Sequence, residues 1–129
     1  MSDEKEIRDL LATYALTLDI GDFEACMKLF TDDGEFVVYG ETLAGEEIRK
    51  MFTRAPGGIH LCGATLVDLH GDTATARTQV LFINSSTHEL RPALYDDELV
   101  KSHGCWRFRR RRCQFLTASG LSDSPKERS

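Results

Sequence analysis

Apolar side chains recur every three or four residues over the first twenty positions of the chain. This spacing predicts one amphipathic helix over 4–20, with an apolar stripe made of Ile7, Leu10, Leu11, Tyr14, Ala15 and Leu18. Gly21 ends the helix, and Asp22 can cap a second helix that reaches Phe30. The pattern predicts a helical hairpin, followed by a turn at 31–34 and a short strand at 35–39.

The pattern changes in the second half of the chain. After a loop over 40–45, a third helix carries Ile48, Met51 and Phe52 on one side and ends near Pro56. From residue 59 onward polar and apolar residues alternate, which predicts half-buried antiparallel strands over 59–69, 73–84, 93–101 and 105–116.

Helices followed by a run of antiparallel strands indicate the α+β class, in which helices cover one face of a sheet. A strongly curved sheet of this kind forms a cone-shaped barrel with one open end. We therefore expect a single domain over 1–116, wrapped by the three helices around an apolar pocket, and a flexible polar tail over 117–129.

Composition excludes several classes of protein. The 129 residues are 41% apolar and 29% charged. A chain of this length and apolar content can form one stable hydrophobic core without disulfides or metal ions. An acidic N-terminus with no apolar run after it does not fit a signal peptide, and no stretch approaches the roughly 20 apolar residues of a membrane helix. We expect a cytoplasmic protein with no membrane partner, whose four cysteines are reduced, mostly buried thiols.

Three residues could border one cavity and perform proton transfer. Tyr14 and Asp19 stand about 7.5 Å apart along the axis of the first helix. Asp19 lies in the last turn, where the helix dipole disfavours a carboxylate. His60 begins the first long strand on the same face as Cys62 and Leu66, and an imidazole beside a carboxylate is a general base. The alternatives are an exposed, loop-capping Asp19 and a structural His60.

A series of short motifs runs through this part of the chain: Tyr14-x4-Asp19-x-Gly21-Asp22, Leu29-Phe30-Thr31-x-Asp33-Gly34, Gly45-x2-Ile48, Gly58-Ile59-His60 and Gly104-x-Trp106-Arg107-Phe108. Their order and spacing over residues 4–116 resemble the SnoaL-like branch of the nuclear transport factor two-like superfamily, which includes scytalone dehydratase, bile-acid 7α-dehydratase and ketosteroid isomerase. The resemblance implies a curved antiparallel sheet wrapped by three helices around a deep apolar pocket, and a homodimer through the sheet.

The resemblance also implies roles for three side chains. In the dehydratase-like members an aspartate and a histidine form the acid–base pair and a tyrosine polarises a substrate oxygen. Asp19, His60 and Tyr14 match these positions.

The rest of the expected pocket follows from the faces of the helices and strands. Asn84 and Asp97 lie on faces that can point inward, where buried polar groups need partners, and the alternative is a position near a strand end in water. The expected substrate-binding residues are Phe36, Val38, Met51, Phe52, Cys62, Leu66, Phe82, Asn84, Asp97, Leu99 and Trp106.

An arginine-rich run covers residues 107–112. Trp106 and Phe108 share one parity and Cys113 and Phe115 the other, so we expect a bulge that turns one arginine inward. The other arginines should be solvated or paired with the acidic helices, since residues 1–50 hold thirteen acids against five bases. A pI of about 5.3 does not fit a nucleic-acid-binding surface.

These features predict a cofactor-independent enzyme, either a dehydratase-like lyase or an isomerase. The expected substrates are apolar small molecules, including polycyclic molecules. Asp19 and His60 would exchange the proton, and Tyr14 would donate a hydrogen bond to a developing oxyanion or leaving hydroxyl. We expect no metal, because His60-x-Cys62 and His103-x-Cys105 lack the spacing of common zinc motifs. The alternative is a non-catalytic hydrophobic-ligand-binding protein or dimeric interaction module of the same fold.

Overall fold

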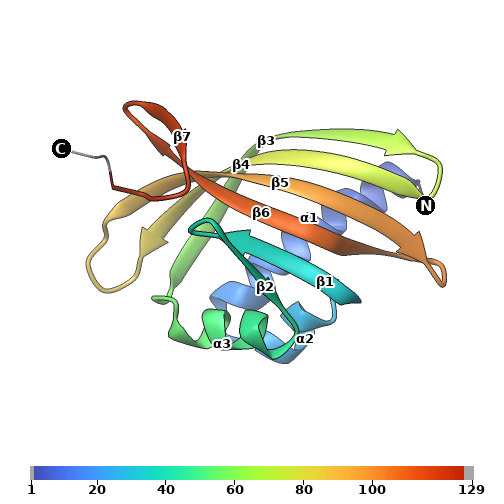
Figure 1. The fold of residues 1–129 in the computed structure, drawn as a ribbon, viewed down its shortest axis with the longest axis horizontal. Helices are drawn as coiled ribbons and strands as arrows, with labels where there is room; N and C mark the ends of the chain where they lie inside the picture. Colours follow the sequence, from blue (N-terminus) through green and yellow to red (C-terminus); the bar gives the residue numbers. More distant parts are fainter. Residues whose placement is uncertain (1, 127–129) are drawn as a thin grey trace.

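A curved sheet that packs against α1 dominates the fold, which a computed structural model describes for residues 2–126 (Figure 1). The helices are α1 (Asp3–Asp19), α2 (Phe23–Met27) and α3 (Glu46–Arg54). The strands are β1 (Phe30–Val38), β2 (Glu41–Ala44), β3 (Gly58–His70), β4 (Thr73–Asn84), β5 (Leu90–Ser102), β6 (Cys105–Thr117) and β7 (Gly120–Ser122). The α+β class and the N-terminal helices are confirmed.

The sheet runs in the order β2-β1-β6-β5-β4-β3, with β7 paired to β6. It is not closed, since β2 and β3 stand at opposite edges of this order. Four of the five contacts along the order are antiparallel, whereas β1 and β6 run parallel. The expectation of a purely antiparallel sheet was wrong at this pair, because the chain between β1 and β6 crosses the whole sheet before it returns.

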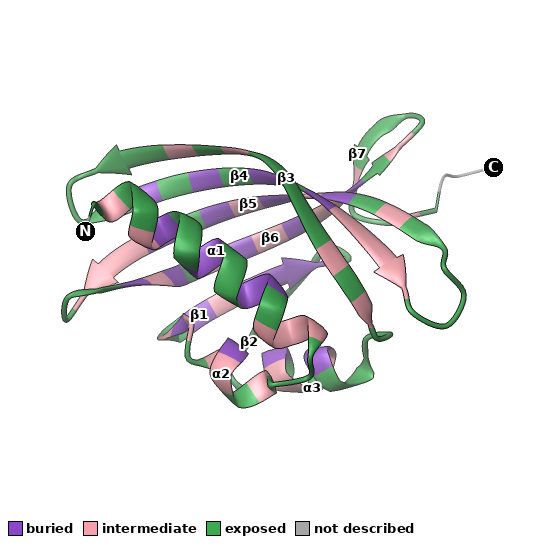
Figure 2. Ribbon diagram, turned by 180° about the vertical axis from the view of Figure 1, so that it is seen from behind, coloured by how far each residue is buried: buried purple, intermediate pink, exposed green. Residues whose placement is uncertain are grey.

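Helix α1 lies across one face of the sheet and turns its buried residues toward the strands (Figure 2). Its first turn is capped by Ser2, whose hydroxyl accepts a hydrogen bond from the Lys5 N–H. Helix α2 is capped by Asp22 as expected, but it ends at Met27 and not at Phe30. The reason is that the Leu29 carbonyl accepts a hydrogen bond from Phe108 of β6, which draws the chain into the sheet.

Several segments expected to be irregular form strands. Residues 31–34, expected as a turn, belong to an irregular part of β1, where a side chain on Gly34 would crowd backbone atoms of Thr31 and Phe108. Strand β2 occupies the expected loop over 40–45, and β7 lies within the expected polar tail. Each of these two strands pairs with the strand just before it, β2 with β1 and β7 with β6. With four and three residues they are too short to show a clear alternation of polar and apolar residues.

Two bulges decide which side chains face the core. One extra residue in β3, between Cys62 and Thr65, reverses the parity of the strand beyond it. Leu66 therefore faces away from the core and Val67 packs against it. In β6 the register shifts by one residue between Phe108 and Arg110, which turns Arg111 inward and confirms the expected bulge.

Arg111 is the most unusual residue of the core, since its side chain is only 1% exposed. Its Nε lies 3.0 Å from Oδ1 of Asp97, which is equally buried. The guanidinium carbon lies 3.7 Å from the centroid of the Tyr95 ring, 4.2 Å from that of Tyr14 and 4.6 Å from that of Phe108. Burial raises the pKa of Asp97 to about 7, although the charge of Arg111 opposes the shift.

The neighbouring arginines lie on the outer face beside carboxylates. Arg110 lies 3.9 Å from Glu35 and 3.8 Å from Glu98, and Arg112 lies 3.6 Å from Asp123. Their partners belong to strands and to the C-terminal segment, and both side chains remain 43% exposed. Of the two expected alternatives, contact with solvent therefore holds for these arginines and pairing with the acidic helices does not.

All four cysteines are free, with Cys26 and Cys113 buried and Cys62 and Cys105 exposed. Mostly buried thiols were expected, and this holds for half of them. Within residues 2–126, no helix is long and apolar enough to cross a membrane.

Replacing Asp97 with leucine should lower the free energy of unfolding by about 3–5 kcal/mol, because Arg111 keeps its charge in the core without a partner. In urea unfolding, the double variant Asp97→Leu/Arg111→Met should recover most of this loss. Asp96→Leu is the matched control, since its pair with Arg77 lies at the surface and contributes about 0–1 kcal/mol. Equal losses for Asp97→Leu and Asp96→Leu would contradict the assigned role of the buried pair.

Alkaline pH should destabilise the fold through its buried thiols. Burial raises the pKa of Cys26 from 9.0 to about 11, so the unfolded chain releases this proton at lower pH than the folded chain. The stability that the raised pKa contributes is complete below pH 9 and is lost as the pH rises through 11. Near pH 10, Cys26→Ala should reduce the pH dependence of the unfolding free energy by about 1 kcal/mol per pH unit. Cys105→Ala, at an exposed thiol, should not.

Candidate active site

A cavity of about 850 Å³ lies between the C-terminal end of α1, helix α3 and one end of the sheet. Tyr14, Asp19 and His60 all line it. Most of the remaining lining is apolar and comes from Leu18, Phe23, Phe36, Val38, Leu43, Met51, Phe52, Val80, Phe82, Ala93 and Phe115. The three residues expected to act together thus share one largely apolar cavity.

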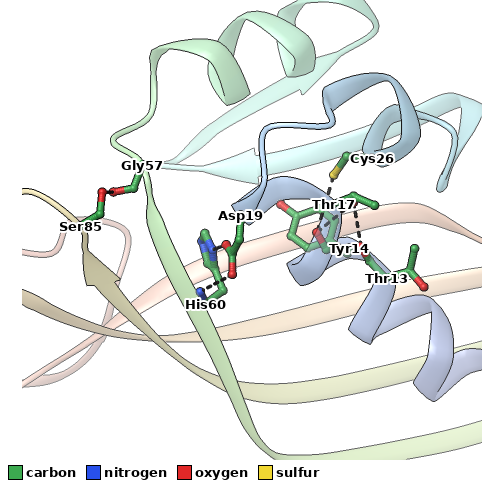
Figure 3. A network of polar contacts seen from close by, with 8 residues as sticks. All are labelled: Thr13, Tyr14, Thr17, Asp19, Cys26, Gly57, His60 and Ser85. Carbon is green, nitrogen blue, oxygen red and sulfur yellow. Dashed lines mark hydrogen bonds and ion pairs between the residues drawn. The ribbon is translucent and has the colours of Figure 1, made fainter.

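Asp19 and His60 are joined by two hydrogen bonds (Figure 3). Oδ2 of Asp19 accepts from the backbone N–H of His60 at 2.9 Å, and Oδ1 lies 2.6 Å from the ring Nδ1. The side chains are 16% and 18% exposed. Asp19 is the last residue of α1 and His60 is the third of β3, so the pair ties the end of the helix to the edge of the sheet.

This contact selects one tautomer of the imidazole. An ionised carboxylate can only accept, so Nδ1 of His60 carries the proton and Nε2 holds a free lone pair. Nε2 has no hydrogen-bond partner within residues 2–126, and the ring packs on Phe82 with the centroids 4.8 Å apart. The arrangement leaves His60 able to accept a proton at Nε2 while Asp19 stabilises the resulting cation.

Among residues 2–126, no three histidine, cysteine or acidic side chains are arranged to hold a metal ion.

Gly58 allows β3 to start close to β4. A Cβ at this position would overlap the carbonyl oxygen of Ile83 and the ring of Phe82. Any residue other than glycine at position 58 would therefore displace Phe82 or move the start of β3, two residues before His60.

Tyr14 provides a hydroxyl at the cavity. Its ring meets those of Phe52, Tyr95 and Phe108 edge to face, with centroids 5.7–6.0 Å apart. Burial raises the pKa of Tyr14 well above its usual value, so the hydroxyl keeps its proton. The hydroxyl has no hydrogen-bond partner in the described part of the chain. Tyr14 can therefore donate a hydrogen bond to an oxygen of a ligand.

Tyr95 is a cavity residue that was not among the expected site residues. Burial also raises its pKa, and its hydroxyl likewise has no partner between residues 2 and 126. The alternation that places Asp97 inward places Tyr95 inward too, so the sequence contained the signal. Arg91, a second cavity residue that was missed, lies two residues before Ala93 on the same face.

The expected substrate-binding residues divide into two groups. Phe36, Val38, Met51, Phe52 and Phe82 line the cavity. The other six are not among the lining residues, and two of these lie on β3. Leu66 is 73% exposed on the outer face because of the bulge, and Cys62 is exposed on this edge strand.

Two further expected residues serve other structural purposes. The side-chain oxygen of Asn84 accepts from the N–H groups of Ser86 and Thr87 and so shapes the turn after β4. Asp97 is held by Arg111 in the core. Neither residue is among those that line the cavity.

Leu99 and Trp106 are buried near the opposite end of α1 from the cavity. The indole N–H of Trp106 donates to Asp3, the first residue of the helix, at 3.0 Å. A helix of 17 residues spans about 24 Å, which separates this region from Asp19. The long strands run from the cavity to the opposite end of α1. The alternation of inward and outward residues along a strand therefore does not say at which of these two ends an inward residue lies.

Comparison with solved structures finds the same fold. An NTF2-like protein with a cystatin-like fold from Novosphingobium aromaticivorans is 30% identical, with a TM-score of 0.81 over 92% of this chain and 86% of that one. A scytalone dehydratase-like protein from the same organism is 23% identical, with a TM-score of 0.79 over 95% and 87%. The hexachlorocyclohexane dehydrochlorinase LinA-type3 from Novosphingobium barchaimii is 18% identical, with a TM-score of 0.77 over 92% and 88%.

No curated protein matches the chain. Residues 1–112 match the family model described as a SnoaL-like domain, which covers both Asp19 and His60. The fold and this match agree with one another. The chain belongs to the family of SnoaL-like domain proteins.

Proposed function

We propose that this protein is a cofactor-independent acid–base enzyme, either a dehydratase-like lyase or an isomerase. Its proposed substrates are apolar small molecules, including polycyclic molecules. The observation that carries the proposal is the geometry of His60. Asp19 holds Nδ1 and the backbone N–H, which leaves Nε2 without a protein partner at the wall of an apolar cavity.

In the proposed elimination, Nε2 of His60 takes a proton from a carbon of the substrate. The C–H electron pair forms a carbon–carbon double bond, and a leaving group on the adjacent carbon departs with its own bonding pair. A leaving hydroxyl receives this same proton from the His60 imidazolium and departs as water, which returns His60 to its neutral form, and Tyr14 is the hydrogen-bond donor to the leaving oxygen. In the proposed isomerisation, Nε2 takes a proton from a carbon next to a carbonyl group, and Tyr14 donates a hydrogen bond to the oxyanion that forms on the carbonyl oxygen. The imidazolium then returns the proton to a different carbon.

The surroundings of the pair support this chemistry. A mostly apolar cavity strengthens the interaction of the Asp19 carboxylate with an imidazolium, because little water screens the two charges. Two structural neighbours carry the names of elimination enzymes, a dehydratase and a dehydrochlorinase. The proposed reaction is of the same general type.

A second candidate function is binding without catalysis. The cavity is large and mostly apolar, and these properties would also suit a protein that only holds a hydrophobic ligand. In that case, ligand affinity would survive substitution of Asp19 and His60, and no chemical change of the ligand would follow.

The enzyme proposal predicts that His60→Ala and Asp19→Asn each reduce turnover by at least ~100-fold. A panel of cyclic ketones, cyclic alcohols and chlorinated cycloalkanes would be incubated with the protein in deuterium oxide. Nuclear magnetic resonance would then report carbon-bound deuterium and eliminated products.

The matched control is His70→Ala, which removes an exposed imidazole at the other end of β3. This variant should keep full activity, and circular dichroism should show all three variants folded. Full activity in both His60→Ala and Asp19→Asn would disprove the assignment of this pair.

We further propose that the outer face of the sheet binds a second copy of the chain. Opposite the side of His60, register aligns Ile59, Ile83 and Leu90 in one row across β3, β4 and β5. Leu61, Leu81 and Pro92 form the next row. Exposed fractions of 47% for Ile59 and Leu61 and 63% for Leu90 indicate an apolar surface without a cover in the single chain.

Light scattering coupled to size exclusion should therefore report twice the 14.5 kDa mass of one chain. Leu61→Lys should shift the protein toward the mass of a single chain, because it places a charge within the apolar rows. Leu16→Lys, at an exposed leucine of α1, should leave the dimer intact. A wild-type protein that stays a monomer over a concentration series would contradict the proposal.

A further inference from the structure

Arg91 lines the cavity without an acidic partner. It lies near the start of β5 and is partly buried, yet within residues 2–126 no carboxylate is within 4.0 Å of its guanidinium. By contrast, Arg49, Arg77 and Arg112 each have such a partner. A partly buried cation without a counter-ion leaves hydrogen-bonding capacity unused on the side that faces the cavity.

The register of the sheet places Arg91 in line with the acid–base pair. His60 pairs with Phe82 across β3 and β4, and Phe82 pairs with Arg91 across β4 and β5. Directly paired residues point to the same face, so these three side chains form a row along the cavity wall. Adjacent strands lie about 4.8 Å apart, which places the backbones of His60 and Arg91 about 10 Å apart.

One aromatic ring lies beside the guanidinium. Its carbon lies 5.9 Å from the centroid of the Phe115 ring, which itself stacks on Tyr39 at 5.4 Å. A guanidinium on a ring face keeps the N–H groups at its edge free for a planar, two-oxygen acceptor. The guanidinium can therefore form an ion pair with an anionic group of a ligand.

Apart from Asp19, which is held by His60, the other acidic and basic side chains at the cavity lie on its exposed rim. Lys50 and Arg54 of α3 are exposed, as are Glu41 and Glu47, so positive and negative side chains are balanced there. Among the cavity-lining cations of the described chain, Arg91 is the one that is partly buried and sits on the sheet itself.

We infer that Arg91 binds an acidic oxygen group of the ligand, a carboxylate or a sulfonate. The ligand is then an aromatic or alicyclic acid, whose ring body packs on Phe82 between its anionic end and His60. The placement of a reacting carbon at His60 rests on the proposed function, whereas the anion site at Arg91 does not.

Two fluorescent probes that differ in one sulfonate test this site. Anilinonaphthalene sulfonate is anionic, N-phenyl-1-naphthylamine is its neutral counterpart, and both gain fluorescence in apolar cavities. The wild-type protein should bind the sulfonate at least about tenfold more tightly, as a charge-assisted hydrogen bond would require. Arg91→Gln should abolish this preference by weakening the sulfonate alone, with the affinity for the neutral probe unchanged.

Lys50→Gln is the matched control, since it removes an exposed cation from the same cavity and should keep the preference. Phe82→Ala should weaken both probes, because both pack their rings on this side chain. Arg91→Lys keeps the charge but loses the planar fork, so it should retain part of the preference. The inference is overturned if neither probe binds, if the wild type binds both equally, or if Arg91→Gln keeps the preference.

The outcome is separate from that of the catalytic proposal. His60→Ala should keep the tenfold preference for the sulfonate, because His60 does not contact the anionic end. A preserved preference without any turnover in the deuterium experiment would refute the acid–base function and leave the anion site standing. Turnover that depends on His60, with no role for Arg91 in probe binding, would refute the anion site alone.

Discussion

The buried charge of Arg111 is the constraint on which the centre of this fold depends. A guanidinium out of contact with water needs a carboxylate beside it, and Asp97 of the adjacent strand provides one at 3.0 Å. The same guanidinium packs on Tyr14 of α1 and on Tyr95 of β5, so helix and sheet meet around one charge. Both tyrosines also line the cavity, which means that the core contact sets the position of the hydroxyls offered to a ligand.

The Asp19–His60 contact performs a similar task at the open end of the molecule. A carboxylate in the last turn of a helix opposes the helix dipole, and two hydrogen bonds from β3 compensate for this. The contact holds the helix end against an edge strand, orients the imidazole and selects its tautomer in a single arrangement. The shape of the cavity and the orientation of His60 therefore depend on the same few atoms, and an anion at Arg91 would extend this row of polar groups along the wall.

Much of the fold could be predicted from periodicity. The first helix, the long strands and the cap at Asp22 follow from local spacing, and the parity conflict within the arginine run correctly indicated a bulge. Tyr14, Asp19 and His60 were predicted to border one cavity, and all three line it. The parallel pairing of β1 with β6 was missed, because its partners lie far apart in the chain. The strands β2 and β7 were missed, because four and three residues are too few to show a strand pattern.

The amino-acid sequence by itself determined the class of the fold, through the spacing of apolar residues, and the family, through the order of short motifs along residues 1–112. Only the tertiary structure decided which inward positions reach the cavity. A single extra residue in β3 turned Leu66 out of the core, and the length of α1 placed Trp106 at the opposite end from Asp19. Such outcomes depend on pairing between strands and on distances across the core, and residue spacing within one element contains neither.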